Sequence, residues 1–173
     1  MQGERRREEF EYAKPYFYSR AMLAILLLSV VVILFANQKG EALPWFALLV
    51  VLLGGSLLVF GISPLLTNHW LTRSRIVLRR GYYFKAVIPL REVSDVRIYE
   101  GEAKLGLALS LSSSILFVTS SRHDLVEIRL RGARRFPQML GLRAKRIVFN
   151  VDRPTEFLAS ANERLASLAP VEA

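Results

Sequence analysis

Two long runs without a charged side chain constrain this chain more than any other feature. Sixteen residues from Ala21 to Ala36 carry no charge, and twenty-five more from Ala42 to Leu66 carry none either. About twenty apolar residues in a helix span the roughly 30 Å hydrocarbon layer of a membrane. A helix also satisfies its own backbone hydrogen bonds there. We therefore predict a transmembrane hairpin over about 16–66, with helices at about 16–36 and 44–64.

Neither buried core helices nor a signal peptide accounts for the two runs as well. Buried core helices would need far more surrounding chain than the remaining residues provide. Arg5–Arg7 resembles the basic start of a signal peptide, but no small-residue cleavage site follows the first run. The second helix should begin at Pro44, where a missing N–H costs nothing, and should kink or stop near Ser63 and Pro64.

The distribution of lysine and arginine predicts the orientation of the hairpin. Lys39 is the only basic residue in the segment 37–43 between the runs, whereas eighteen basic residues follow the second run. The residues before or at the start of the first run are Arg5, Arg6, Arg7, Lys14 and Arg20. The positive-inside rule then places both termini, including the segment 1–15, in the cytoplasm of a plasma (inner) membrane protein. The chain has no cysteine, which excludes disulfides and thiolate chemistry.

The remaining residues, 67–173, predict a separate basic domain. They hold eighteen Lys/Arg and ten Asp/Glu, a net charge of +8. Apolar side chains recur at every second position, which indicates half-buried strands of an antiparallel sheet. The predicted strands are 75–79, 95–99, 105–111, 126–131 and 147–151, with turns at 80–81 and 120–124. The order of strands within 101–121 does not follow from this pattern.

The period changes from two to that of a helix after Asp152 and Pro154, which suit a helix start. The apolar positions at helical spacing are Phe157, Leu158, Ala161, Leu165 and Leu168. We expect this amphipathic helix to close one end of a strongly bent sheet.

Three segments resemble bacterial and archaeal pleckstrin-homology-like (PH-like, bPH2-type) domains that follow a transmembrane hairpin. They are His69–Gly81, Ile88–Val96 and Asp152–Phe157, with Trp70 where such domains usually have tyrosine. The resemblance covers about 61–168. It implies a seven-stranded bent sheet or partly open barrel with a closing helix, in a prokaryotic, membrane-tethered protein without enzymatic activity.

We find no catalytic or metal-binding constellation in the sequence. His69 and His123 are the only histidines, and we interpret both as solvated or interfacial. Ser112–Ser114 has no neighbouring base, and Gly101–Gly106 lacks the end of a phosphate loop. No nucleic-acid-reading element is recognisable. We therefore expect no enzyme activity, no cofactor, no small-molecule substrate and no nucleic-acid partner.

Small residues predict a packing face on the two apolar helices. These are Ala47, Gly54 and Gly61 on the second helix, and Ser29 and Ala36 on the first. Small residues let helix backbones approach closely in lipid. The stripe either packs the hairpin against itself or docks another membrane subunit. Neither run carries an ionisable residue in its interior, which is unlike transporters and proton pumps.

Basic residues supply two further candidate surfaces. Those expected to face anionic headgroups are Arg20, Arg73, Arg75, Arg79, Arg80 and Lys85. The segment 132–146 is predicted to be a long apolar loop with basic flanks. Its candidate docking residues are Arg134, Arg135, Phe136, Met139, Leu140, Leu142 and Arg143. This loop either folds back over the sheet or contacts the bilayer or a partner.

Together these features favour a non-enzymatic, membrane-anchored module that acts as a scaffold or accessory subunit. Its expected partners are the lipid bilayer and another membrane protein, or a second copy of the chain. The alternative is a module that binds or senses lipid headgroups without a protein partner. An enzyme with unrecognised catalytic groups is the weakest hypothesis.

Overall fold

The computed structural model describes residues 8–12, 14–35 and 42–168. The chain forms two compact units. One unit comprises Lys14–Thr67 and the turn Gly81–Tyr83, and it contains the two apolar helices. The other unit contains the strands and the C-terminal helix.

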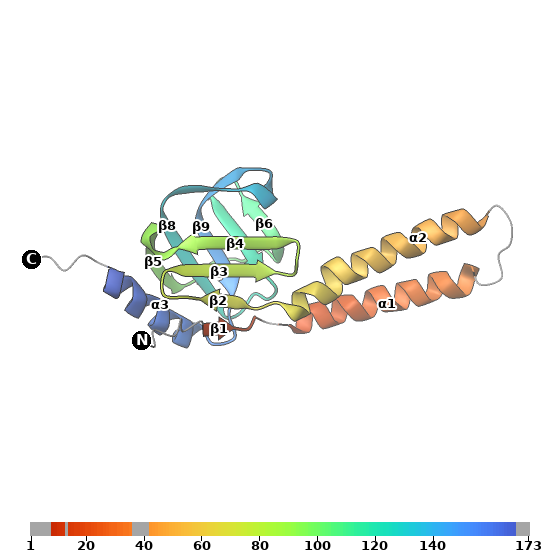
Figure 1. Cartoon of the computed structure of the whole chain (residues 1–173), viewed down its shortest axis with the longest axis horizontal. Coiled ribbons are helices and arrows are strands. Elements are labelled where there is room, and N and C mark those ends of the chain that lie inside the picture. The colour runs from red at the N-terminus through yellow and green to blue at the C-terminus, as the bar shows by residue number, and fades with distance from the viewer. Residues whose placement is uncertain (1–7, 13, 36–41, 169–173) are drawn as a thin grey trace, which may run out of the picture. The chain divides into compact units, whose positions relative to one another are not determined.

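The helical unit consists of two apolar helices, as the sequence predicts (Figure 1). Helix α1 spans Pro15–Phe35 and α2 spans Ala42–Ser56. The second helix continues as a π-helical segment, η1 (Leu57–Ile62), and a 3-10 segment, η2 (Ser63–Leu66). The predicted disturbance near Pro64 is confirmed, because the helix changes its hydrogen-bond pattern just before this residue and ends soon after it. Proline lacks the N–H that a regular helix needs at this position.

The turn Gly81–Tyr83 belongs to the helical unit through specific contacts. The backbone N–H of Gly81 donates to Oγ1 of Thr67 at 2.9 Å, and that of Tyr82 donates to Oγ of Ser63 at 3.2 Å. Gly81 has φ +62°, and a Cβ there would lie 2.3 Å from the Ser63 hydroxyl. Only glycine therefore fits this turn without displacing its neighbours.

The strand-containing unit has two sheets and one long helix (Figure 1). The first sheet has the order β1-β2-β3-β4 and the second β5-β8-β9-β7-β6. The first sheet consists of β1 (Glu8–Phe10), β2 (His69–Leu71), β3 (Arg75–Arg80) and β4 (Phe84–Pro89). The second consists of β5 (Val93–Ile98), β6 (Gly106–Ser110), β7 (Ile115–Thr119), β8 (Leu125–Phe136) and β9 (Leu142–Asn150). Short 3-10 turns are η3 (Leu90–Glu92) and η4 (Pro137–Met139), and the C-terminal helix is α3 (Pro154–Leu168).

All five predicted strands and the C-terminal helix are present, but the prediction of a purely antiparallel sheet is wrong. Strand β7 pairs with β9 in parallel, so the second sheet is mixed. The described residues form nine strands rather than the seven that the family resemblance implies. One unpredicted strand, β1, pairs antiparallel with β2, with Glu9 opposite Trp70. Alternation identifies strands in a sequence but does not specify which strands pair.

The main core of this unit lies between the inner faces of the sheets and α3. Ile76 and Ile88 are register partners in the first sheet, and Ile128 and Ile147 are partners in the second; all four are fully buried. Helix α3 packs against β5, η3 and β8. Its Phe157 makes edge-to-face contacts with Phe10 and Phe149, at centroid distances of 5.0 and 5.4 Å. These rings join the ends of the chain to the core.

Candidate functional site

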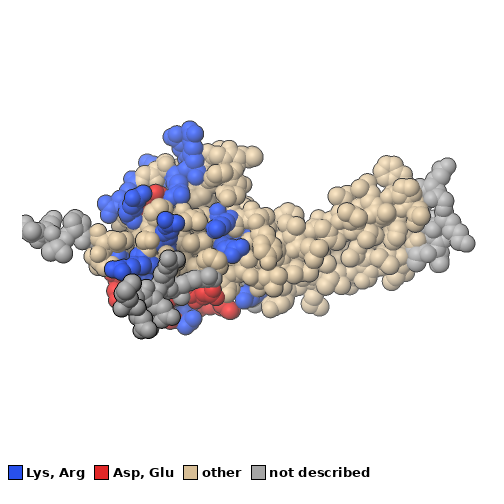
Figure 2. All heavy atoms as spheres, in the orientation of Figure 1, with Lys and Arg blue, Asp and Glu red and all other residues tan. Residues whose placement is uncertain are grey.

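The surface of the helical unit is apolar along almost its whole described length. The two apolar helical windows lie within Tyr16–Phe35 and Leu43–Leu66, and only 6% and 17% of an 18-residue stretch of each is buried. Beyond Arg20, neither window contains a charged side chain, and Figure 2 shows the Lys and Arg side chains gathered on the strand-containing unit. The core helices of a soluble protein would be mostly buried, and these two are mostly exposed. Both are also long and apolar enough to cross a membrane.

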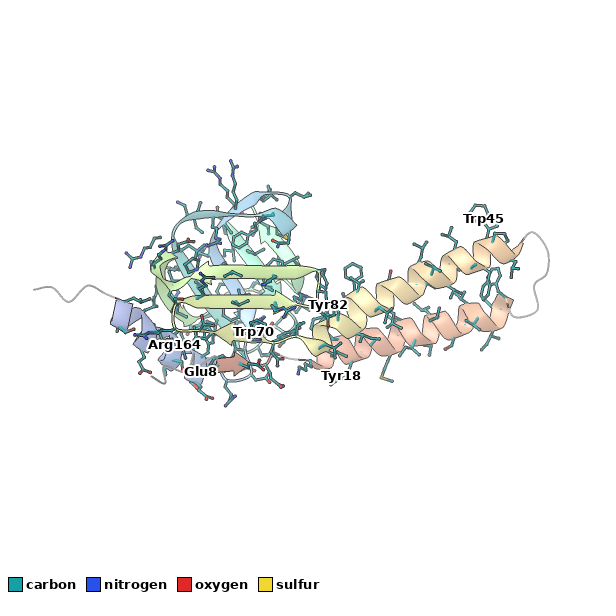
Figure 3. The ribbon with its side chains drawn as sticks, viewed as in Figure 1. Glu8, Tyr18, Trp45, Trp70, Tyr82 and Arg164 are labelled. Atoms are coloured by element: carbon teal, nitrogen blue, oxygen red, sulfur yellow. The ribbon has the colours of Figure 1, made fainter. Side chains whose placement is uncertain are left out.

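Aromatic side chains lie at opposite ends of this helical pair. Tyr18 is near the start of α1 and Trp45 is near the start of α2, and both point away from the helix pair (Figure 3). Tyr16 is also near the start of α1, and the Arg20 guanidinium lies 4.5 Å from the centroid of the Tyr16 ring. Tyr and Trp at both ends of a helix pair are typical of membrane–water interfaces.

The predicted small-residue stripe does not form one continuous contact. Gly61 is buried, and a Cβ added there would lie 3.5 Å from Cα of Ala21 on α1. Gly54 has open space where a Cβ would be, and Ala47 and Ser29 are exposed. Ala36 lies outside the described residues. Within the described helices, Gly61 alone of the predicted set serves close helix packing.

The basic residues predicted to face headgroups divide into exposed and buried groups. Arg73, Arg75 and Lys85 are exposed, as is Arg20. Arg79 is half-buried, with its guanidinium 5.1 Å from the ring centroid of Trp70.

Arg80 corrects this prediction, because it is only 4% exposed and donates from Nη1 to the backbone oxygen of Thr119 at 2.7 Å. Its side chain points inward since Arg80 is the register partner of buried Phe84.

The interpretation of His69 as solvated or interfacial is also wrong. Its side chain is 1% exposed and packs in the strand-containing unit, stacked on Tyr12 and edge-on to Phe149. Burial, and secondarily the charge of Arg80, lowers the pKa of His69 from 6.5 to about 3. His123 is exposed in the β7–β8 turn, as predicted.

The segment 132–146 is a hairpin rather than a long loop. Strand β8 runs through to Phe136, and β9 resumes at Leu142, with Arg135 opposite Arg143. Phe136 is buried, which agrees with folding back onto the sheet. Leu140 is 95% exposed at the tip, while the other members of the predicted docking set on the strands are at least partly exposed. Of the apolar side chains of this segment, Phe136 therefore belongs to the core and Leu140 to the exposed tip.

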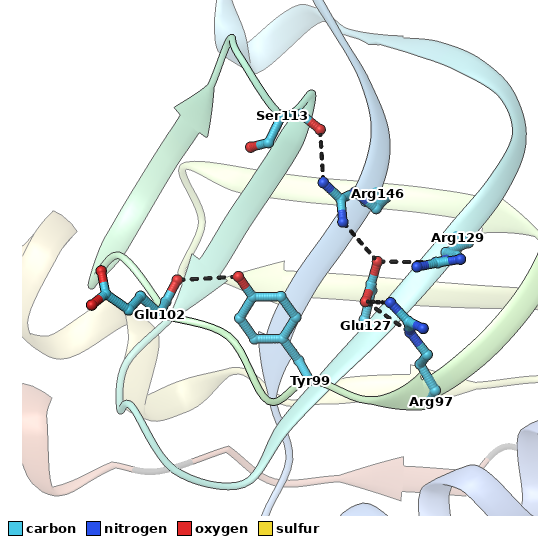
Figure 4. Close-up of polar contacts among 7 residues, drawn as sticks. All are labelled: Arg97, Tyr99, Glu102, Ser113, Glu127, Arg129 and Arg146. Atoms are coloured by element: carbon cyan, nitrogen blue, oxygen red, sulfur yellow. Dashed lines mark hydrogen bonds and ion pairs between the residues drawn. The ribbon is translucent and has the colours of Figure 1, made fainter.

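A charged cluster occupies the outer face of the five-stranded sheet. Its centre is Glu127 on β8, which is 1% exposed on the side chain. Arg97 on β5 donates to its Oε2 from Nε and Nη2, at 3.0 and 2.8 Å. Arg129 donates from Nε to Oε1 at 3.3 Å, and Nη1 of Arg146 lies 3.6 Å from Oε1 (Figure 4). One carboxylate therefore faces three guanidinium groups, which leaves a local excess of two positive charges.

Alternation on the strands explains why these groups meet. Glu127 and Arg129 are two residues apart on β8, so they point to the same face. The register places Arg97 opposite Glu127 and Arg146 opposite Arg129. Like charges directly across a strand pair repel each other, and the shared carboxylate of Glu127 offsets this repulsion.

Beside the cluster lies a cavity of about 540 Å³. Tyr99 and the segment 100–104 form one wall, and the hydroxyl of Tyr99 donates to the backbone oxygen of Glu102 at 3.1 Å (Figure 4). The apolar side chains of Ile115 and Phe117 line the cavity, and they pack with Leu125 and Val148 in a second buried apolar cluster. This second apolar cluster shows that the outer face of the sheet is partly covered rather than a simple solvated surface.

Sequence reasoning missed this cluster. The residues Glu127, Arg129 and Arg131 alternate with apolar ones, and such alternation ordinarily indicates a solvent face. Complementary charges on two predicted strands, Arg97 and Glu127, were the available signal, but it needs the strand pairing to be known. Ser112–Ser114, for which the sequence offers no neighbouring base, lies in the β6–β7 turn.

No group of three or more potential metal ligands occurs among the described residues. A scan against protein-family models, a search of curated proteins and a search of solved structures each give no match to this chain.

Proposed function

We propose that this chain is a non-enzymatic, membrane-anchored module in which α1 and α2 form a transmembrane hairpin and the strand-containing unit lies in the cytoplasm. The exposed apolar surface of the two helices carries the proposal, since more than four fifths of each helical window is unburied. Exposing so much apolar surface to water is unfavourable, and lipid removes that cost. The aromatic residues Tyr18 and Trp45 at opposite ends of the helix pair support the same conclusion.

The strand-containing unit is, in this proposal, a PH-like domain. Two sheets closed by a C-terminal helix that packs against β5 and β8 favour such a fold. The parallel β7–β9 pair and the short β1 strand are additions to the pattern that the resemblance implies. The motif segments lie at β2–β3, at β4–β5 and at the start of α3, in the order expected of that family.

Scaffolding or service as an accessory subunit is the role that we assign to the module. The helix pair uses Gly61 for its internal contact and leaves the rest of the small-residue stripe, Ala47 and Gly54, open. In lipid, such a face can accept another transmembrane helix. The exposed tip of the β8–β9 hairpin, with Leu140 between basic strands, offers a second contact surface.

Lipid-headgroup binding is the alternative role, and the exposed basic residues favour it. Arg73, Arg75 and Lys85 are exposed and lie within twenty residues of the end of the second apolar window. Each basic side chain held near an anionic membrane contributes about 1 kcal/mol of attraction.

Membrane extraction followed by mild solubilisation tests the proposal. We expect the full chain to stay in the membrane fraction through alkaline carbonate washing and to require detergent for release. The double substitution Val30→Arg and Leu52→Arg places a charge on the exposed face of each helix and should abolish this retention, at about 3 kcal/mol per arginine. Val30→Ile with Leu52→Ile is the matched control.

Release of the unsubstituted chain by carbonate alone would contradict the membrane proposal. A stoichiometric protein that co-purifies in mild detergent supports the scaffold role. Retained anionic lipid without any protein partner supports the headgroup-binding alternative.

A further inference from the structure

A second pocket adjoins the charged cluster on the other side of Arg146. It has a volume of about 420 Å³. Three cationic side chains and four serines account for all but one of its lining residues, and no carboxylate lines it. These residues are Arg129, Lys145, Arg146, Ser94, Ser112, Ser113, Ser114 and Leu130. A pocket of this composition is complementary to an anion with several oxygen atoms.

The charge of this pocket is incompletely neutralised. Arg129 and Arg146 are register partners on β8 and β9, and both form an ion pair with Glu127. Arg97 also contacts this carboxylate, through two nitrogens. On the neighbouring strand β5, Asp95 is the register partner of Arg129, but no ion pair joins these two side chains. Lys145 likewise has no ion pair with any described residue. An additional anion would relieve the repulsion among these three cations.

Hydrogen-bond donors are available and held in place. Arg129 uses Nε for Glu127, which leaves its terminal nitrogens for a ligand. The β6–β7 turn is fixed to β9, because the backbone oxygen of Ser114 accepts from the N–H groups of Lys145 and Arg146 at 2.9 and 3.2 Å. Nη2 of Arg146 donates to the backbone oxygen of Ser113 at 3.1 Å, as Figure 4 shows. These bonds use main-chain oxygens, so the hydroxyls of Ser113 and Ser114 remain free to donate.

We propose that this pocket binds a phosphate group, with Arg129 and Lys145 as the principal charged contacts and the serine turn as a supplementary donor surface. Planar guanidinium and ammonium groups beside hydroxyl donors match the several oxygens and the double charge of a phosphate monoester. The phosphate could belong to a soluble compound or to a lipid headgroup. The proposal does not depend on the membrane location of the chain, so each can fail separately.

Protection of Lys145 from an amine-reactive reagent tests the site in the full chain embedded in phosphatidylcholine nanodiscs. Inorganic phosphate, compared with chloride at equal ionic strength, should lower labelling of Lys145 by about fivefold. Lys104, which is exposed and outside this pocket, should be unaffected and serves as the internal reference. Phosphatidic acid in the nanodisc, without free phosphate, tests the lipid source in the same way. Protection by phosphate identifies a soluble ligand, and protection by phosphatidic acid identifies a headgroup.

Substitution separates the pocket from general positive charge. Arg129→Gln should raise the phosphate concentration for half protection by about tenfold, because a charge-assisted contact is lost. Arg122→Gln removes the same charge from the β7–β8 turn outside the pocket and should leave that concentration unchanged. Ser113→Val removes one of these hydroxyls, keeps the main-chain oxygen that Arg146 contacts, and should also weaken protection. Equal protection of Lys104, no protection by either phosphate source, or equal effects of Arg129→Gln and Arg122→Gln would overturn the proposal.

Discussion

His69 has one ring nitrogen with a partner and one without. The backbone N–H of Arg79 donates to Nδ1 at 3.2 Å, so the proton of the neutral ring lies on Nε2. Nε2 is buried without a hydrogen-bond partner among the described residues. Protonating Nδ1 would break the bond from Arg79 and place a second charge near Arg80. The lowered pKa of His69 follows from burial first and from this charge second.

The lowered pKa of His69 makes stability depend on pH in one direction. The unfolded chain protonates this histidine near pH 6.5, and the folded chain only near pH 3. Between these values the unfolded state binds more protons, so stability is complete above pH 6.5 and falls as the pH drops toward 3. We expect a loss of about 1.4 kcal/mol per pH unit from this residue within that window.

Chemical unfolding of the full chain at pH 7, 6, 5 and 4 would measure this loss, with Trp70 fluorescence as one reporter of β2. His69→Gln should be less stable than the unsubstituted chain at pH 7 but should lose less stability on acidification. His123→Gln, in an exposed turn, should keep the original pH profile. Identical profiles for His69→Gln and the unsubstituted chain would show that His69 does not control acid sensitivity.

Among the elements, the second apolar helix has small residues in two different environments. Gly61 packs against α1, and Gly54 is open and could be tested as a docking position. A Cβ at Gly61 would lie 3.1 Å from Leu57 and 3.5 Å from the α1 backbone at Ala21, whereas a Cβ at Gly54 meets nothing within 4 Å. Gly61→Leu should therefore destabilise the helix pair by about 1–3 kcal/mol through overpacking. Gly54→Leu should change stability by no more than about 0.5 kcal/mol.

Thermal unfolding in detergent would compare these variants, with Leu58→Ile at an exposed site as the control. Any partner that co-purifies provides a second readout. Loss of that partner in Gly54→Leu with unchanged stability would identify the open part of the stripe as a docking face. Equal destabilisation by both glycine substitutions would contradict the packing described for Gly61.

In the β8–β9 hairpin, likewise, Phe136 is buried in the core and Leu140 is exposed for contact with a membrane or partner. Leu140 is exposed in the left-handed region, with φ +55°, where aspartate is better tolerated than leucine. Met139→Asp with Leu140→Asp should therefore leave the domain folded and weaken contact with the membrane or a partner. Phe136→Asp should instead unfold the domain, because it places a charge at a buried position.

A photo-crosslinking side chain at Leu140 in the membrane-embedded chain would report what this tip touches. We expect lipid or protein adducts, and we expect them to decrease when Met139 is also replaced by aspartate. A tip that yields no adduct has no role in docking. Unfolding of the double aspartate variant would show that these side chains belong to the core.

The elements differ in how far the sequence predicted them. Long apolar runs and sustained alternation specify α1, α2 and most strands, because burial imposes a fixed period on each. Strand β1 was missed since Glu8–Phe10 is too short and too charged to show a period. The β7–β9 pairing and the Glu127 cluster depend on contacts between residues about thirty positions apart. Periodicity within one segment contains no information about such contacts.

At the scale of the whole molecule, charge and apolar surface are divided between the two units. The helical windows contain one charged residue, Arg20, and the chain from residue 67 onward has a net charge of +8, from eighteen basic and ten acidic residues. Basic residues within about twenty residues of a transmembrane helix end set its orientation, and five of them follow Leu66 within that range, so the larger unit should remain on the side where the chain is made. The segment Asn37–Leu43 has Lys39 as its only basic residue, so it should cross the membrane most readily.

A reporter of compartment tests this orientation directly. Fused after Ala173, it should read cytoplasmic, and inserted at Gly40 it should read external. Three arginines added beside Lys39, with Arg5–Arg7 replaced by glutamine, reduce the charge asymmetry around the first helix and should lower the external signal at Gly40. The same number of glutamines added beside Lys39 controls for the length of the insertion. Because the basic residues after the second helix are unchanged, the reporter after Ala173 should still read cytoplasmic. An external reading there in the unsubstituted chain would show that basic residues do not set the orientation, and the expected headgroup contacts of Arg73, Arg75 and Lys85 with a cytoplasmic leaflet would fail with it.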